Sequence, residues 1–321
     1  MQHSSSPIRI GARGSRLSQV QARYIQAEVT RLMGADPADA ERVAPVIFIT
    51  TTGDRIQDRR LLEIGGKALF TKEIEEALLD NRIDLAVHCL KDMPSISPPG
   101  LGVAAYPERE DPRDAFISPV ATRIEDLPHG ARLGTASLRR QAQALFRRPD
   151  LSLQLLRGNV DTRLAKLEEG FAEGIVLAYA GLKRLGMADR VAGLIDPVEA
   201  PPAPGQGCLT LQTRTADLDH PVVRALNHAE TELCVAAERG ALEALEGSCK
   251  TAVGAYAVRV DGVLSLVVEG LAADGSQRWR REGAIPAAAI DASVIDAAGR
   301  LGRELGDIVR QEGGDALTPP E

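Results

Sequence analysis

Three predicted strand-to-helix junctions carry arginines beside hydroxyl or amide side chains. The stretches are GARGS, with Arg13 and Ser15; GTASLRR, with Ser137, Arg139 and Arg140; and RGNVDTR, with Arg157, Asn159 and Arg163. A helix N-terminus attracts anions through its free backbone N–H groups and its dipole, and arginine binds carboxylates with two parallel hydrogen bonds. A single arginine here is more simply a solvated surface side chain. Three repeats indicate a site for a ligand with several carboxylates or phosphates.

The segment KDMP follows a predicted buried strand over residues 83–90. Lys91 and Asp92 therefore lie at the carboxyl end of that strand, where α/β folds place ligand-binding groups. Pro94 prevents the strand from continuing. A carboxylate at this position could transfer protons or stabilise a developing positive charge. A Lys91–Asp92 pair with a purely structural role explains the spacing equally well.

Cys249 lies in the loop EGSCKTAVGAY, with no other cysteine nearby and no histidine within twenty residues. Its residue type alone leaves open a packing role, a nucleophile, a metal ligand or a point of covalent attachment. Cys89, Cys208 and Cys234 lie in apolar runs or a helix, and we expect them to be buried packing residues. No His-x-x-x-His or Cys-x-x-Cys spacing occurs, so no metal site is expected.

The composition is ordinary for a soluble globular protein of two or three domains, with 321 residues, 44% of them hydrophobic and 26% charged. The net charge of −7 disfavours nucleic-acid binding. No apolar run is long enough to span a membrane, and the start MQHSSSPIRI lacks the layout of a secretory signal. We therefore expect a cytoplasmic protein with no membrane or nucleic-acid partner.

The elements that position these residues alternate between strand and helix, which predicts an α/β fold. Ser15 can cap the first helix, and Gly34 can end it. Strands are predicted at residues 8–12, 46–51, 83–90, 115–118, 131–135, 151–156, 174–180 and 208–213, and helices at 16–33, 72–80, 137–146, 159–170 and 181–186.

Two proline-bearing stretches, at residues 106–114 and 199–207, are interpreted as crossings between two lobes. They predict a first α/β lobe of residues 1–107 and 208–225 and a second of residues 112–201. The two lobes are expected to be hinged, with a ligand cleft between them.

The pattern changes after Asp219, where one long helix is predicted to reach about Leu245. The Cys249 loop, two strands joined by Asp261-Gly262, and a final helix follow it. Residues 229–321 are therefore expected to form a third, smaller α+β domain.

Several long stretches together resemble one enzyme family: IGARGSRLSQVQA, GGKALFTKEIEEALL, AVHCLKDMP, LGTASLRRQ, LRGNVDTRL, PGQGCL and LEGSCK, in that order. The chain resembles porphobilinogen deaminases over nearly its whole length. Members of that family condense four porphobilinogen molecules head to tail into 1-hydroxymethylbilane, with release of ammonia, in tetrapyrrole biosynthesis. The resemblance implies a monomeric transferase with two hinged α/β lobes like those of type II periplasmic binding proteins, plus a third domain.

The resemblance also implies roles for individual residues. A dipyrromethane cofactor is expected to be bound by a thioether to Cys249, and Asp92 is expected to be the catalytic residue. Phe70 is expected to close over the site, on a mobile loop of residues 55–70. The other implied cofactor contacts are Asp54, Lys91, Thr135, Ser137, Arg139, Arg140, Arg157 and Arg163. The implied substrate contacts are Arg13, Ser15, Gln21, Lys67, Phe70 and Arg184.

Four positions depart from the family pattern, and none of them removes an expected catalytic group. Glu63 stands where lysine is common, Ala136 where serine is, Ser248 where glycine is, and Gln212 where glutamate is. Two other functions fit some of the features. A non-catalytic anion-binding protein is disfavoured by Asp92 and by the lack of a signal-like start. A nucleotide-dependent enzyme is disfavoured because no GxxxxGK[ST] or GxGxxG loop occurs.

Overall fold

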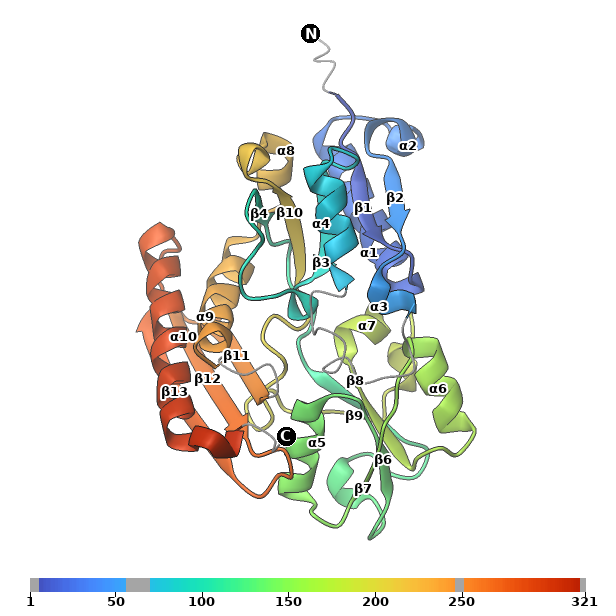
Figure 1. Ribbon diagram of the computed structural model, residues 1–321, viewed down its shortest axis with the longest axis vertical. Coiled ribbons are helices and arrows are strands. Elements are labelled where there is room, and N and C mark those ends of the chain that lie inside the picture. Colours follow the sequence, from blue (N-terminus) through green and yellow to red (C-terminus); the bar gives the residue numbers. More distant parts are fainter. Residues whose placement is uncertain (1–5, 56–69, 246–250, 318–321) are drawn as a thin grey trace. The chain divides into compact units, whose positions relative to one another are not determined.

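The structure is a computed structural model that describes residues 6–55, 70–245 and 251–317 (Figure 1). The chain divides into two compact units, and each is described by itself. The first consists of Met1–Arg109 and Cys208–Glu232, and the second of Glu110–Gly207 and Leu233–Glu321. Within the described ranges, no helix has the length and apolar character needed to cross a membrane.

The first unit is built on a mixed five-stranded sheet in the order β2-β1-β3-β10-β4. Strand β1 is parallel to β2 and β3, whereas β10 is antiparallel to β3 and β4. The strands are β1 (Ile10–Arg13), β2 (Val46–Ile49), β3 (Leu85–Cys89), β4 (Leu101–Ala105) and β10 (Leu209–Arg214). The helices are α1 (Arg16–Leu32), α2 (Ala40–Val43), α3 (Thr52–Arg55), α4 (Lys72–Leu79) and α8 (Pro221–Arg224).

Helix α1 begins and ends where its sequence predicts. The Ser15 side chain accepts a hydrogen bond from the backbone N–H of Ser18, which satisfies one of the free donors of the first turn. Gly34 follows the helix with φ of 67°, a left-handed conformation that glycine adopts without a Cβ clash. Ala22, Ile25 and Val29 form the buried face of the helix. Because α1 starts directly after β1, it fixes Arg13 and Ser15 beside the end of that strand.

The second unit contains another mixed sheet, in the order β7-β6-β8-β5-β9. Its strands are β5 (Asp114–Ile117), β6 (Arg132–Gly134), β7 (Ser152–Gln154), β8 (Gly174–Ala178) and β9 (Gly193–Leu194). Its helices are α5 (Leu138–Arg147), α6 (Val160–Glu168) and α7 (Tyr179–Arg184). The two sheet-containing lobes confirm the α/β prediction, and the short strands β4 and β9 were not predicted.

A small C-terminal domain of one antiparallel sheet and two long helices also belongs to the second unit. Its strands β11 (Ala252–Val260), β12 (Val263–Leu271) and β13 (Arg278–Pro286) pair in that order, beside α9 (Ala229–Leu245) and α10 (Ala292–Gly313). Asp261 and Gly262 form the predicted hairpin turn, with φ of 49° and 73°. Strand β13 was not predicted, because its charged side chains give it no apolar run. The boundaries predicted for this domain stay predictions.

The prediction of one helix over residues 219–245 is wrong, because the chain forms α8 and α9 with a break between them. The side chain of Asn227 accepts a hydrogen bond from the backbone N–H of Tyr106, and the backbone N–H of His228 donates to the carbonyl of Tyr106. These long-range bonds hold the break, and a periodicity of apolar residues does not reveal them.

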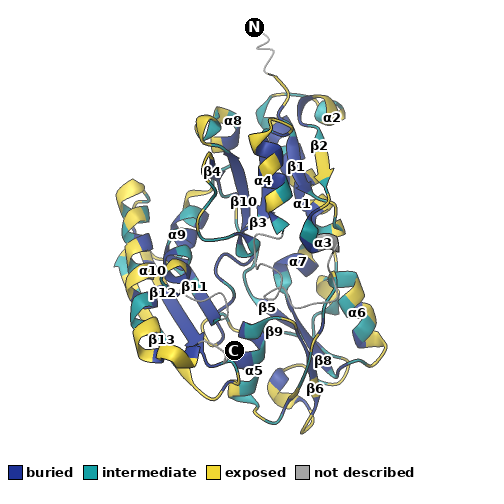
Figure 2. Cartoon of the chain, viewed as in Figure 1, coloured by how far each residue is buried: buried dark blue, intermediate teal, exposed yellow. Residues whose placement is uncertain are grey.

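Buried residues follow the inner faces of the sheets and of their helices (Figure 2). In the C-terminal domain, α9 and α10 approach closely because glycine occupies their contact. A Cβ atom on Gly302 would lie 2.0 Å from the carbonyl oxygen of Ala237. A Cβ atom on Gly299, one turn earlier, would meet nothing nearer than 3.6 Å. The close approach therefore depends on Gly302 and leaves room at Gly299.

We expect Gly302→Ala to destabilise the fold, because the methyl group overlaps backbone; forced overpacking typically costs about 1–3 kcal/mol. Gly299→Ala is the matched control, since it adds the same methyl group to the same helix without a clash, and alanine favours helix over glycine by about 1 kcal/mol. Urea unfolding of both variants measures the difference. Equal stabilities for the two would contradict the close helix contact.

Candidate active site

A small cavity lies at the carboxyl ends of β1 and β3. These strands are parallel neighbours, so both ends reach the same edge of the sheet. β3 is followed by a single 3-10 turn, η4 (Leu90–Asp92), which ends at Asp92. The residues that line the cavity are Arg13, Ser15, Leu17, Ser18, Gln21, Phe70, Thr71, Val87, His88, Cys89 and Asp92. The structure thus brings together five predicted site residues: Arg13, Ser15, Gln21, Phe70 and Asp92.

Arg13 and Phe70, which both line this cavity, form a cation–π contact. The guanidinium carbon of Arg13 lies 4.2 Å from the centroid of the Phe70 ring. Gly53 makes room for that ring, because a Cβ atom there would lie 2.3 Å from a Phe70 ring carbon. The contact orients the arginine. The mobile loop predicted at residues 55–70 lies largely outside the described residues, so that role of Phe70 stays a prediction.

Gln21 and Cys89 meet on another wall of the cavity. The side-chain Nε2 of Gln21 donates a hydrogen bond to Cys89 Sγ over 3.2 Å, and Gln21 is 4% exposed. Cys208 and Cys234 are buried, as predicted, but Cys89 is partly exposed. The prediction that Cys89 only fills space is therefore wrong. Its place at the end of an apolar strand concealed that the strand end opens into a cavity.

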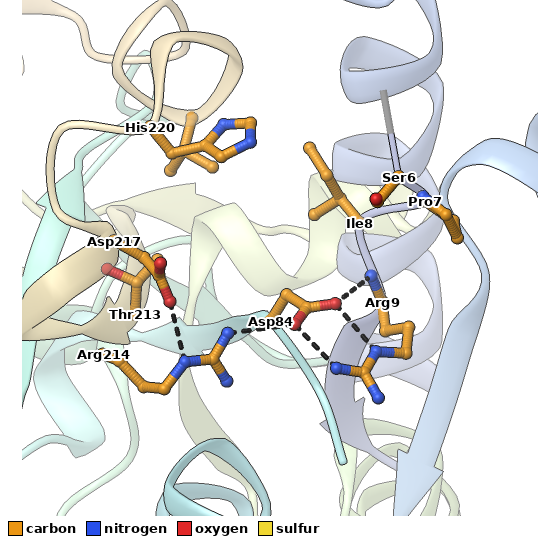
Figure 3. A pocket seen from close by; sticks show the side chains of 10 residues that line it. Ser6, Pro7, Ile8, Arg9, Asp84, Thr213, Arg214, Asp217 and His220 are labelled. Carbon is orange, nitrogen blue, oxygen red and sulfur yellow. Dashed lines mark hydrogen bonds and ion pairs between the residues drawn. The ribbon is translucent and has the colours of Figure 1, made fainter. Parts of the chain in front are cut away.

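A larger cavity of about 350 Å³ lies at the opposite edge of the same sheet (Figure 3). Asp84 accepts hydrogen bonds there from the backbone and side chain of Arg9 and from the side chain of Arg214. Arg214 also pairs with Asp217. Burial alone would raise the pKa of Asp84, but these hydrogen bonds outweigh it and lower the pKa to about 2.

The charged side chains of this larger cavity are therefore paired with one another. Asp84 and its two arginines connect the starts of β1 and β3 to the end of β10, which is a structural task. The smaller cavity, at the carboxyl ends of the strands, contains the predicted catalytic carboxylate. We therefore take the smaller cavity as the candidate active site.

The predicted cofactor-binding residues of α5 surround a buried carboxylate in the second unit. Arg139 Nη1 donates to one oxygen of Asp114 over 2.8 Å, and Arg140 Nη2 donates to the other over 2.7 Å. Arg139 and Arg140 are 5% and 8% exposed, so they are not solvated surface side chains. At the start of the helix, Ser137 caps the backbone N–H of Arg140, and Thr135 Oγ1 accepts from the N–H of Ser137.

Asp114 was not predicted, although it lies in the stretch EREDPRDAF at the start of the second lobe. Burial would raise its pKa, but the two arginines outweigh burial and hold the pKa of Asp114 far below its ordinary range. One carboxylate balances only one of the two guanidinium charges. Asp114 by itself therefore leaves the pair with an excess of positive charge, and the buried Glu269 is a second carboxyl group whose charge acts on Arg139.

Two buried guanidinium nitrogens in the second unit have no hydrogen-bond partner within the described ranges. They are Nε of Arg139 and Nη1 of Arg157. A buried donor without an acceptor is unfavourable, so such atoms are suited to contact with an acidic ligand. This observation fits an anionic group that binds beside α5 and β7.

The remaining predicted residues are spread over both units. Arg163 and Arg184 donate to the carbonyl oxygens of Gly158 and Gly207 over 2.8 Å each. Lys91 belongs to η4 but does not line the cavity. Asp54 lies in α3, but its side chain is not among those described. Lys67 and Cys249, and the departures Glu63 and Ser248, lie outside the described residues. Among those described, no cluster of three or more His, Cys, Asp or Glu residues could bind a metal ion.

Comparison with known proteins gives one consistent result. Residues 8–221 match the family described as "Porphobilinogen deaminase, dipyromethane cofactor binding domain", and residues 232–307 match its C-terminal domain. A porphobilinogen deaminase of Caulobacter sp. strain K31 is 62% identical over 320 residues, which is 99% of this chain and 100% of the relative. A second, from Phenylobacterium zucineum, is 59% identical over 317 residues, which is 97% of this chain and 98% of the relative.

Solved structures give weaker matches. A methionine-binding lipoprotein of Bacillus subtilis has 13% identity and a TM-score of 0.42, over 69% of this chain and 88% of its own. A periplasmic substrate-binding protein of Coxiella burnetii has 12% identity and a TM-score of 0.43, over 68% of this chain and 89% of its own.

The two lobes, the C-terminal domain and the family matches define a transferase of tetrapyrrole biosynthesis that uses a dipyrromethane cofactor. The chain belongs to the porphobilinogen deaminase family, whose members polymerise porphobilinogen into hydroxymethylbilane.

We expect Asp114→Asn to destabilise the protein strongly, because it leaves two buried guanidinium groups without a counter-charge; breaking a buried pair typically costs about 3–5 kcal/mol. Asp126→Asn makes the same chemical change at an exposed position and should alter stability by less than about 0.5 kcal/mol. Thermal unfolding at neutral pH compares them. A small, equal effect of both would mean that Asp114 does not balance the arginines.

Proposed function

We propose that the cavity at the carboxyl ends of β1 and β3 is where porphobilinogen units are joined, with Asp92 as the catalytic carboxylate. The observation that carries this proposal is the convergence of Asp92, Arg13 and Phe70 on one cavity. Loss of ammonia from porphobilinogen leaves a cationic azafulvene, and the terminal pyrrole carbon of the growing chain attacks it. The side chain of Asp92 stabilises that cation and accepts hydrogen bonds from pyrrole N–H groups.

Arg13 supplies the complementary charge for the substrate. Each porphobilinogen carries an acetate and a propionate, and a guanidinium binds a carboxylate with two hydrogen bonds. The ring face of Phe70 contacts the Arg13 guanidinium. Ser15 and Gln21 line the same cavity and add polar groups.

The second unit fits the acidic dipyrromethane cofactor. The buried donors Arg139 Nε and Arg157 Nη1 have no hydrogen-bond partner among the described residues, and the cofactor carries carboxylates. Arg139, Arg140 and Arg157 would hold those carboxylates, with Cys249 as the thioether anchor. When bound, the cofactor supplies the primer to which new pyrroles are added. Ser137 and Thr135 fix the first turn of α5 and so orient the two arginines of that helix.

The wider setting of the enzyme is also part of the proposal. We propose that it acts as a monomer in the cytoplasm on a small-molecule substrate, without nucleic acid. The net charge of −7 supports the last point, since nucleic-acid binding requires clustered positive charge.

Asp92→Asn should lower the rate of hydroxymethylbilane formation by about 10²–10⁴-fold, the usual contribution of such a group. Folding and cofactor content should stay normal, because the change removes a charge without changing shape. Product formation, intact mass and thermal unfolding measure the three properties, with Asp126→Asn as the control. A near-normal rate would exclude Asp92 from the chemistry.

Cys249→Ser should abolish the covalent dipyrromethane, and Arg157→Leu should reduce it, because one change removes the anchor and the other a buried donor. The adduct is visible in the intact mass of the purified protein and as colour with Ehrlich's reagent, which reacts with pyrroles. Cys234→Ser, at a buried packing position, is the control and should keep the adduct. An unmodified wild-type protein, even after incubation with porphobilinogen, would contradict the proposed function.

A further inference from the structure

A buried chain of hydrogen bonds runs behind the cavity and ends at His88. Thr71 Oγ1 donates to Glu75 Oε2, Gln212 Nε2 donates to Glu75 Oε1, and His88 Nε2 lies against Gln212 Oε1, with each distance 3.2 Å. The four residues are between 0% and 7% exposed. They come from α4 and its cap, from β10 and from β3, so the chain crosses the centre of the first unit.

This series of hydrogen bonds fixes the tautomer of His88. The Glu75 carboxylate can only accept hydrogen bonds, so the Gln212 amide must turn its NH₂ group toward Glu75. Its carbonyl oxygen then faces His88 and can only accept, which requires the proton on Nε2. The other ring nitrogen, Nδ1, keeps its lone pair. His88 lines the cavity together with Asp92.

The imidazole is neutral under ordinary conditions. Burial lowers the pKa of His88 to about 4, although its hydrogen bond to Gln212 opposes the shift. The charge of Arg13 on β1 lowers it further, and the charge of Asp92 on η4 raises it. At neutral pH the ring is therefore an acceptor with a free lone pair.

Joining two pyrroles requires such an acceptor. One C–C bond forms, and the C–N bond of the aminomethyl group breaks, with ammonia taking the electron pair. When the aminomethyl group enters protonated, it leaves as neutral ammonia. The C–H bond at the α-carbon of the attacking pyrrole then breaks to restore aromaticity, and that proton needs a base. A carboxylate that stabilises the cation works best while it remains ionised, so a second group suits the proton step.

We propose that His88 Nδ1 accepts the proton released from the substrate α-carbon, and that Gln212, Glu75 and Thr71 hold His88 in the required tautomer. This inference rests on the proposed function of the cavity. After the transfer the imidazolium lies beside Asp92, whose charge favours it, and the proton then passes to water. Asp92 thus stabilises the substrate cation, and His88 accepts the proton from the α-carbon.

Substrate deuterated at its free α-carbon tests the proton step in the cofactor-loaded enzyme. His88→Gln keeps a side chain of similar size and polarity but lacks the basic lone pair. It should lower kcat by about 10²–10⁴-fold, as for loss of a general base. It should also enlarge the deuterium isotope effect on kcat, because C–H cleavage becomes rate-limiting. His220→Gln, at the opposite edge of the sheet, should change neither.

A lowered kcat with no increase in the isotope effect would mean that His88 has only a structural role, and it would overturn the proposal. An unchanged kcat would overturn it as well. These outcomes are separable from failure of the proposed function, in which wild-type protein forms no hydroxymethylbilane and Asp92→Asn therefore has no effect.

Nitrogen-15 NMR of histidine-labelled protein tests the tautomer without any turnover. We expect the His88 signals of a neutral ring protonated at Nε2, from pH 6 to pH 8. Gln212→Leu should mix the tautomers, because it removes the acceptor, whereas Gln212→Glu should preserve the Nε2 proton. A wild-type ring protonated at Nδ1 would contradict the proposal, because the lone pair would then face Gln212.

Discussion

The pairing of buried carboxylates with arginines is the constraint on which this protein depends. A guanidinium buried without a counter-charge is strongly unfavourable, so each one must face a carboxylate of the protein or of a ligand. Asp114 forms ion pairs with Arg139 and Arg140 in the second unit. Asp84 forms ion pairs with Arg9 and Arg214 in the first. The first set has more positive charge than negative, and its Arg139 Nε has no hydrogen-bond partner in the part of the chain that the structure describes. It is therefore suited to an acidic ligand, whereas the Asp84 set is complete in itself.

In the first sheet, the structural ion pairs and the candidate active site lie at opposite ends of the strands. At the amino ends of β1 and β3, Arg9 and Asp84 connect the strands to β10. At the carboxyl ends, Arg13, His88 and Asp92 gather on a cavity. Parallel neighbours bring like ends together, so residues distant in the sequence meet at one edge. The short 3-10 turn after β3 places Asp92 at that edge, where it lines the cavity.

Much of this arrangement could be predicted from the sequence. Ser15 marked a helix start that the structure confirms, and Asp261-Gly262 marked a hairpin. The KDMP segment marked a strand end. The single helix predicted over residues 219–245 failed because contacts to Tyr106 break it. Strand β13 was not predicted because the sequence of a partly exposed strand with many charged side chains resembles that of a loop. Asp114 was not predicted because its stretch contains many charged residues, and only burial shows which of them pairs with the arginines.

The sequence by itself determined the alternation of elements, the family and the residue types available for chemistry, because these depend on local periodicity and on motif spacing. The tertiary structure decided which charges are satisfied and which remain. The sequence left Arg139 and Arg140 as either solvated surface side chains or anion-binding groups, and the fold buries them against Asp114. His88 read as part of an apolar strand, yet the fold places it on a cavity with its tautomer fixed by Gln212. Burial and hydrogen-bond partners arise from contacts between distant segments, and no local pattern encodes them.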